Sequence, residues 1–324
     1  MDLKQVEYIV QIANECNITK AAEKLFLTQS ALNQQLLKLE RELQTPLFYR
    51  SRTNWRLTPA GEVYIKNAKE LLRIKRETYR IISDIAETKK GNLSVGFTPG
   101  RGIPMFTRVY PKFHGLYPDI VVTPVEASVK KQQIMIENGD LDLGFLTLSD
   151  NQKKSTNRYI DICEEDICLA VPENDPLADL VNFPEEISNI TPFRDRPFVL
   201  MYKESSFRPL IDGIFQKAGF SPKVLFETSQ IPAIVTIIES GICCGIIPYL
   251  YLKGKEKKIR YCYLPGRPTW KICASYGSQS YLGRPAKEFI RLAADYWVAS
   301  ETVQLQSSGI VKRDAGKIGT KFDF

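Results

Sequence analysis

The chain contains 324 residues, of which 44% are hydrophobic and 25% are charged, as in an ordinary globular protein of two or three domains. Its net charge of +7 is compatible with a polyanionic partner but is too small to identify one. The chain has a single histidine and seven cysteines without C-x-x-C spacing, which argues against a zinc site. It has no run of about eighteen apolar residues, which argues against a membrane-spanning helix.

The seven cysteines are spread along the chain and are odd in number. Buried free thiols in a reducing cytoplasm are the first expectation, and a redox-sensing pair of Cys163 and Cys168 is the alternative. The acidic residues Asp2 and Glu7 interrupt the start of the chain, so no signal peptide is expected. The sequence therefore favours a cytoplasmic protein that holds no metal or cofactor and has no membrane partner.

The N-terminal part of the chain is organised around residues 21–50. Leucines recur there at steps of three and four residues, with one interruption near Leu27 and Thr28, which predicts two short helices joined by a tight turn. A bracing helix is expected before them, over residues 3–14. Thr28 is placed to cap the second helix of the pair with its hydroxyl group. An amphipathic hairpin with no DNA-binding role is the alternative interpretation.

Four short motifs in this stretch resemble the helix-turn-helix of the LysR-type transcriptional regulators. They are Ala21–Ala22, Thr28–Gln29–Ser30–Ala31, Leu39–Glu40 and Leu47–Phe48–Tyr49–Arg50. The chain departs from the family pattern at Asn33, where Ser or Thr is usual, and at Gln44, where a glycine usually follows the recognition helix. Gln44 must then end that helix without the freedom of glycine at positive φ, and Asn33 leaves the base preference open.

The polar residues at the start of the second helix are expected to contact DNA. Short hydrogen-bond donors and acceptors at the N-terminus of a recognition helix meet the base edges in the major groove. Residues 48–57 follow as a short basic hairpin, which predicts a wing whose arginines contact phosphate or enter a minor groove. The expected DNA-binding residues are Thr28, Gln29, Ser30, Asn33, Gln34, Lys38, Arg50 and Arg52.

A long helix is predicted to begin after Thr58, its N-cap, with Pro59 as its first residue, and to continue to Lys90. Residues alternating three and four apart form the pattern of a coiled-coil seam. They are Ile65, Ala68, Leu72, Lys75, Tyr79, Ile82 and Ala86. Dimerisation through this helix would space two recognition helices by one or more DNA turns on a pseudo-palindromic site. Packing of the helix against its own chain is the alternative.

Beyond residue 92 the pattern changes to alternating strands and helices, which predicts parallel sheets with right-handed crossovers. A first unit is expected to have strands 93–97, 120–125 and 143–148 and helices 103–116 and 130–138. A second unit is expected to have strands 198–202, 224–227 and 245–248 and helices 207–218 and 231–240. The further expected elements are strands 168–171, 259–264 and 270–276 and a closing helix, 284–298.

Two such units in tandem, with crossing segments near Glu165 and Gly266, resemble the two-lobed periplasmic-binding-protein-like effector domain of the same family. The expected fold class is α/β overall, with an N-terminal winged helix-turn-helix, a long linker helix and this effector domain. The expected domains are 1–61 for DNA binding, 62–91 for the linker and dimerisation helix, and 92–303 for effector binding. Within the last, lobe 1 covers 92–164 and 267–303 and lobe 2 covers 165–266, while 304–324 form a flexible tail.

A ligand is expected at the carboxyl ends of the strands, where helix N-termini present free N–H groups. The resemblance implies that hydroxyl-bearing residues there face a cleft between the lobes, although helix capping is an alternative role for each. Helix N-termini, hydroxyls and either Arg101 or Arg208 favour an anion such as a carboxylate metabolite. The expected effector-binding residues are Thr98, Pro99, Gly100, Arg101, Thr147, Ser205, Ser206, Phe207, Ser229 and Gln230.

No catalytic constellation accompanies these features. Ser205 and Ser206 lack a G-x-S-x-G elbow, and His114 lies inside a predicted helix. Together with the resemblance to the LysR-type regulators, this implies a regulator that is not an enzyme. Its expected partners are double-stranded DNA, a small anionic effector and copies of itself in a homodimer or homotetramer, with RNA polymerase as a further candidate. The rival is a solute-binding-like or transferase-like α/β protein that has an accessory helical domain and does not bind DNA.

Overall fold

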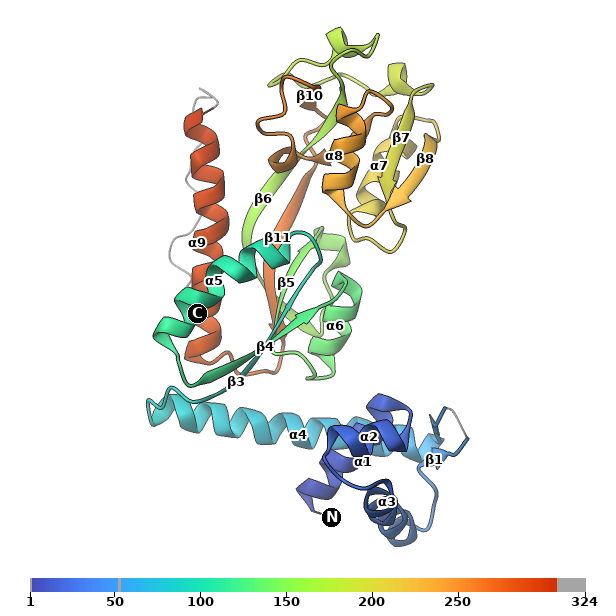
Figure 1. Cartoon of the computed structure of the whole chain (residues 1–324), viewed down its shortest axis with the longest axis vertical. Helices are drawn as coiled ribbons and strands as arrows, with labels where there is room; N and C mark the ends of the chain where they lie inside the picture. The colour runs from blue at the N-terminus through green and yellow to red at the C-terminus, as the bar shows by residue number, and fades with distance from the viewer. Residues whose placement is uncertain (1, 52–53, 308–324) are drawn as a thin grey trace. The chain divides into compact units, whose positions relative to one another are not determined.

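The computed structural model describes residues 2–51 and 54–307. The chain divides into two compact units, the first ending at Thr88 and the second beginning at Lys89. Each unit is described by itself, with labels as in Figure 1.

The first unit consists of helices and one short β-hairpin. Its elements are α1 (Leu3–Glu15), α2 (Ile18–Lys24), α3 (Gln29–Leu43), β1 (Phe48–Tyr49), β2 (Arg56–Leu57) and α4 (Pro59–Ile85). The helix pair α2 and α3 forms where the leucine spacing predicts it. The strands β1 and β2 pair antiparallel in the stretch that was expected to form the wing.

Both ends of α3 depend on single residues. Thr28 caps its N-terminus, because the hydroxyl oxygen accepts a hydrogen bond from the N–H of Ala31 at 3.2 Å. Gln44 ends the helix in the left-handed conformation at φ +53°, although it is not a glycine. A side chain at such a φ is uncommon, so the departure from the family pattern at Gln44 changes the strain of this cap but leaves its geometry intact.

The first half of the predicted dimerisation seam is buried inside this unit. Ile65, Ala68 and Leu72 of α4 lie in one core cluster with residues of α1 and α3. Lys75, next along the seam, places its Nζ atom 2.8 Å from the Oε1 atom of Glu7 on α1. This half of α4 therefore packs against its own chain, as the alternative interpretation expected. The prediction that these residues form a dimer seam is wrong. The exposed apolar residues of α4 include Leu71, Ile74, Tyr79, Ile81, Ile82 and Ile85.

The second unit begins with lobe 1, which has the predicted β-α-β-α-β order. Its elements are β3 (Gly91–Phe97), α5 (Gly102–Leu116), β4 (Ile120–Glu126), α6 (Val129–Glu137) and β5 (Leu143–Leu148). β3 pairs in parallel with both β4 and β5, as that order requires. Because α4 ends at Ile85 and β3 begins at Gly91, the linker helix is shorter than the expected span of 62–91.

Lobe 2 contains a second parallel pair and two further strands. Its elements are β7 (Pro197–Met201), α7 (Arg208–Lys217), β8 (Lys223–Thr228), α8 (Ile231–Glu239), β9 (Gly245–Pro248) and β10 (Ile259–Tyr263). β7 pairs in parallel with β8, and the isolated bridge between Phe198 and Cys244 links β7 to the segment that leads into β9.

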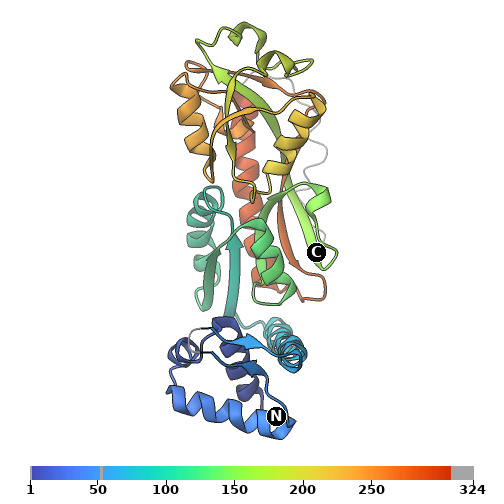
Figure 2. The same cartoon turned by 90° about the vertical axis from the view of Figure 1, so that its right-hand side faces the viewer.

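Two long strands connect the lobes, as Figures 1 and 2 show. β6 (Asn157–Pro172) pairs with β11 (Thr269–Gly277) on the lobe 1 side and with β9 and β10 on the lobe 2 side, always antiparallel. The sequence predicted a short strand at 168–171 with a separate crossing segment near Glu165. One continuous strand supplies both, because each half of β6 has pairing partners in a different lobe.

The closing helix α9 (Arg284–Ser307) lies against α5 and is longer than the expected 284–298. It includes residues 304–307, which were assigned to the flexible tail, so that assignment is wrong for these four. The rest of the predicted tail, 308–324, lies outside the described residues. In the part of the chain that the structure covers, no helix is both long and apolar enough to cross a membrane.

Candidate functional site

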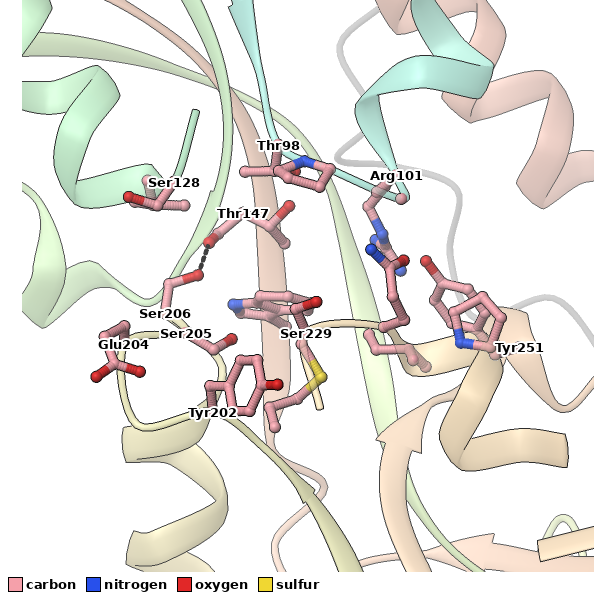
Figure 3. A pocket seen from close by; sticks show the side chains of 18 residues that line it. Thr98, Arg101, Ser128, Thr147, Tyr202, Glu204, Ser205, Ser206, Ser229 and Tyr251 are labelled. Carbon is pink, nitrogen blue, oxygen red and sulfur yellow. Dashed lines mark hydrogen bonds between the residues drawn. The ribbon is translucent and has the colours of Figure 1, made fainter. Parts of the chain in front are cut away.

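A cavity of about 210 Å³ lies between the two lobes, beside the crossing strands. Figure 3 shows the side chains that surround it. They belong to Thr98, Pro99, Gly100, Arg101, Ser128, Val129, Thr147, Met201, Tyr202, Glu204, Ser205, Ser206, Ser229, Gln230, Ile231, Pro232, Tyr251 and Trp270.

Four helices begin at this cavity. α5, α6, α7 and α8 each follow a strand that ends at the same edge of its lobe, and residues just before or at the start of each helix line the space. A helix N-terminus carries unpaired N–H groups and a partial positive charge. The cavity therefore collects the positive ends of two helices from each lobe, an arrangement that favours a negatively charged or oxygen-rich ligand.

Nine of the ten expected effector-binding residues line this one cavity, and Phe207 does not. Phe207 is fully buried behind the wall, where its ring stacks on Trp270 with 4.5 Å between ring centroids. The prediction for Phe207 is wrong because its side chain turns into the core of lobe 2. Ligand contact by the other nine stays a prediction.

Gly100 allows the lobes to approach each other closely. It has φ +79°, in the left-handed region, and a Cβ atom built on it would lie 3.1 Å from the Oε1 atom of Gln230 in lobe 2. A side chain here would strain the turn, and the end of the Gln230 side chain would have to shift by a few tenths of an ångström.

Several lining residues were not predicted. Ser128 obeys the rule that was applied elsewhere, since it follows β4 and caps α6 by accepting a hydrogen bond from the N–H of Lys131. Tyr251 and Trp270 carry no such signal. Tyr251 lies in the 3-10 helix Tyr249–Tyr251 and Trp270 lies on β11, and only the crossing of the two lobes brings them to the cavity.

Arg101 is the one buried arginine in the lining set. Its Nη2 atom lies 2.5 Å from the Oε2 atom of Glu165, and both side chains are almost completely buried. Burial acts to lower the pKa of Arg101, but the negative charge of Glu165 and the hydroxyl of Tyr251 outweigh it and raise the pKa, so the guanidinium stays charged. Its charge is therefore already balanced within the protein.

Arg208 does not reach the cavity. Its guanidinium donates to Asp212 at 2.7 Å, to Glu227 at 2.6 Å and to the carbonyl oxygen of Met201 at 2.8 Å. The expectation that Arg208 contributes to anion binding is wrong, because these three acceptors hold it beneath the start of α7.

Ser206 joins the lobes. Its hydroxyl donates a hydrogen bond of 2.7 Å to the carbonyl oxygen of Thr147 on β5, drawn as a dashed line in Figure 3. The side-chain amide of Gln152 donates in turn to the carbonyl oxygen of Ser206 at 2.9 Å. The loop before α7 in lobe 2 is thus attached to lobe 1 at two points.

The expected base-reading residues form a polar stripe on the first unit. Ser30, Gln34 and Lys38 are exposed at four-residue spacing along α3, so they lie on one face of the helix. Gln29 is exposed beside them, and Asn33 is half-buried. Thr28 is exposed but uses its hydroxyl as the helix cap, which limits it to a secondary part in any contact with DNA.

The wing arginines are less available than predicted. Arg50 pairs with Glu40, a buried carboxylate that also accepts the N–H of Leu47 at 2.8 Å. The Arg50 guanidinium lies over the ring of Trp55, 5.6 Å from its centroid. Arg50 therefore holds the base of the hairpin to α3, and its charge is largely balanced. Arg52 lies outside the described residues.

Two family models match the chain. The model described as "LysR substrate binding domain" matches residues 86–298, which is more than half of the chain. The model described as "Bacterial regulatory helix-turn-helix protein, lysR family" matches residues 3–62. The chain belongs to the LysR family of transcriptional regulators. It is a DNA-binding regulator with an effector-binding domain, not an enzyme.

Relatives of this LysR-type regulator cover nearly all of it. An uncharacterized HTH-type transcriptional regulator of Bacillus subtilis (strain 168), YcgK, is 27% identical over 308 residues, covering 91% of this chain and 94% of the relative. A full-length OxyR variant from Pseudomonas aeruginosa matches with a TM-score of 0.66 at 21% identity, covering 91% of this chain and 97% of that one. Full-length CbnR complexed with its target DNA matches with a TM-score of 0.55 at 20% identity, covering 90% of this chain and 99% of that one. At these identities the two structures establish the fold alone.

The cysteines of this LysR-type regulator are free, and all except Cys16 are buried. Burial raises the pKa of the Cys243 thiol to about 11 and those of Cys244 and Cys262 to about 12. Such thiols stay protonated near neutral pH and react slowly. Across residues 2–51 and 54–307, no group of His, Cys, Asp and Glu side chains is arranged to hold a metal ion.

Proposed function

We propose that this regulator binds a pseudo-palindromic promoter site as a homo-oligomer and that its interlobe cavity senses a small anionic metabolite. The observation that carries the proposal is the cavity at which four helices begin. A ligand held there touches both lobes, so its affinity differs between lobe arrangements, and that difference is what a regulatory ligand requires.

The exposed stripe on α3 supports the DNA-binding half of the proposal. Gln34 is well suited to bonding a base edge, while Lys38 lies one turn further on and suits a phosphate. Gln29, Ser30 and Asn33 complete the reading face at the start of the helix. Because the proposed target is DNA, we infer that the protein acts in the cytoplasm.

The exposed apolar residues of α4 support self-association. Ile74, Ile81 and Ile85 recur seven and four residues apart, and Ile85 is 76% exposed. An apolar stripe of this kind on a protein surface favours a partner, and an identical helix supplies a matching stripe. The proposed seam thus runs along a different side of α4 from the one buried against α1. A homodimer or a homotetramer both fit, and RNA polymerase is a further candidate partner.

The helix ends, and not a spare cation, are proposed to bind the anion, and the one carboxylate in the lining set, Glu204, is exposed. Arg101 is paired with Glu165, and Arg208 is held elsewhere. The partial positive charges of four helix N-termini and the hydroxyls of Thr98, Ser128 and Ser229 remain to bind negative oxygen atoms.

Gel retention of promoter fragments by full-length protein tests both the proposed DNA binding and the proposed sensing of an anion. The complex should resist an excess of random DNA, and carboxylates that raise the melting temperature of the protein should shift the retained fraction or the footprint. A protein that random DNA displaces as easily as specific DNA, or whose DNA binding ignores every stabilising carboxylate, would contradict the proposal.

A further inference from the structure

Glu40 attaches the short hairpin of the first unit to α3, the helix that is proposed to read bases. It lies two residues after Lys38, so it faces away from the exposed stripe of that helix, and its side chain is only 9% exposed. Its Oε1 atom accepts the N–H of Leu47 at 2.8 Å, and its Oε2 atom accepts a hydrogen bond from the guanidinium of Arg50. One carboxylate therefore holds the residue before β1 and the residue after it.

The start of α4 holds the same stretch from the other direction. The carbonyl oxygen of Leu47 accepts the N–H of Thr58 at 3.0 Å, and the Thr58 hydroxyl donates to the carbonyl oxygen of Pro46 at 2.7 Å. A Cβ atom built on Gly61 would lie 2.0 Å from the Leu47 oxygen, so this close approach of α4 requires glycine. The base of the hairpin is thus fixed between α3 and α4.

Arg50 is the more exposed partner of the ion pair. Its side chain is 38% exposed, and its guanidinium lies 5.6 Å from the centroid of the Trp55 ring. The N–H of Trp55 donates in turn to the carbonyl oxygen of Cys16 at 2.8 Å, which ties this residue to the end of α1. A guanidinium oriented by a carboxylate and an aromatic ring can contact a phosphate with its exposed part. Glu40 and that phosphate then compete for one positive charge.

Resting on the proposed reading of DNA by α3 and its hairpin, we propose that Glu40 is a positioning residue that raises the preference of this regulator for its own site over random DNA. Random DNA is bound through charge, and Glu40 reduces the charge that Arg50 offers to any phosphate. At the specific site, the fixed hairpin presents Arg50 to one phosphate beside the bases that α3 reads, and such a contact fixes the register of the protein on the duplex.

Glu40→Gln separates these two effects in full-length protein. The variant keeps an acceptor for the N–H of Leu47 and removes the negative charge. Fluorescence anisotropy at several salt concentrations should show several-fold tighter binding to a random-sequence duplex at low salt. The slope of log affinity against log salt should steepen by about one unit, as for one added phosphate contact. A purely structural role for Glu40 would weaken binding instead, so an unchanged slope or weaker binding to random duplex would overturn the proposal.

Glu7→Gln is the matched control. It raises the net charge of the same unit by one and breaks an ion pair with Lys75, whose Nζ atom lies 2.8 Å from Glu7, away from the hairpin. Its salt slope should stay as in the wild type. On DNA that the wild type selects from random oligonucleotides, the preference over random duplex should fall in Glu40→Gln and persist in Glu7→Gln.

The double variant Glu40→Gln, Arg50→Gln has no unpaired charge at the hairpin and covers the case in which Glu40→Gln alone does not fold. Its salt slope on random duplex should return to that of the wild type, because the gain acts through Arg50. Its affinity for the selected DNA should fall, because the positioned contact is lost. A double variant that keeps the full preference for the selected DNA would overturn the assignment.

Failure of this proposal differs from failure of the proposed function. If the wild type prefers its selected DNA while Glu40→Gln changes neither the salt slope nor that preference, the regulator reads its site and Glu40 has no part in it. If the wild type binds selected and random DNA equally, the proposed reading of a specific site is wrong, and this inference is overturned with it.

Discussion

The hydroxyl of Ser206 donates a hydrogen bond of 2.7 Å to the carbonyl oxygen of Thr147 and so joins lobe 2 to lobe 1 at the edge of the cavity. Ser206 was expected to contact a ligand, but its hydroxyl is already engaged between the lobes. We propose that a ligand in the cavity acts on this hydrogen bond between the lobes.

Ser206→Ala should loosen the lobes. Loss of one hydrogen bond costs about 1 kcal/mol of stability, and the segment 201–208 should exchange its amide hydrogens faster. Ser128→Ala is the matched control, since Ser128 also lines the cavity and accepts one hydrogen bond, but within lobe 1. It should lower stability by a similar amount without faster exchange at 201–208. Equal exchange in the wild type and Ser206→Ala would show that this bond does not hold the lobes.

Gln34→Ala should weaken binding to a specific site by about 1–3 kcal/mol and change binding to random DNA little, because only base contacts carry sequence information. Lys38→Ala should weaken both and reduce the salt dependence by about one unit of slope, as loss of a phosphate contact does. Fluorescence anisotropy at several salt concentrations measures both effects. If Gln34→Ala weakened random and specific DNA equally, Gln34 would not read bases.

Ile85→Asp should dissociate the oligomer, because it would place a charge in the proposed seam where no partner balances it. Ile242→Asp is the control, as Ile242 is also exposed but lies in lobe 2. Sedimentation velocity should show smaller species for the first variant alone. Leu72→Asp does not test the seam, since Leu72 is buried in the first unit and the change would unfold that unit. Oligomers that survive Ile85→Asp would place self-association on another surface.

One thiol should react with Ellman's reagent in the native protein at pH 8, and all seven should react after unfolding. Cys16 is the exposed cysteine, while burial holds the pKa of Cys243 at about 11 and that of Cys273 at about 12. A thiol with so high a pKa is almost fully protonated at pH 8, and only the thiolate attacks the reagent. Fast reaction of a second thiol in folded protein would revive the alternative of a redox pair at Cys163 and Cys168.

Local patterns in the sequence determined which elements form. The leucine spacing and the capping hydroxyl of Thr28 were sufficient to predict α2 and α3, since helix periodicity and caps are properties of neighbouring residues. The loops between strands and helices predicted eight lining residues of the cavity for the same reason, and a ninth, Thr147, lies near the end of β5. Ser128 carries the same signal, since it follows β4 and caps α6, but the expected set omits it.

Contacts between distant segments were beyond such reasoning. The apolar spacing of α4 could not tell which side faces α1, so Leu72 was assigned to the wrong partner. Local patterns also could not predict that Arg101 pairs with Glu165 or that Trp270 lines the cavity, because the pairing of β6 with β11 brings together residues far apart in the chain. The prediction for Phe207 failed because of its side-chain direction. Phe207 follows β7, as expected, but its ring is buried in the core.

Sequencing the DNA that full-length protein selects from random oligonucleotides tests the central claim most directly. If two α3 helices read DNA as a symmetric pair, the selected sequences should share two inverted half-sites whose centres lie about 10–10.5 base pairs, or a multiple of that, apart. Gln34→Ala should then blur both half-sites equally. A selected pool with no common sequence, or with one unrepeated half-site, would contradict the account.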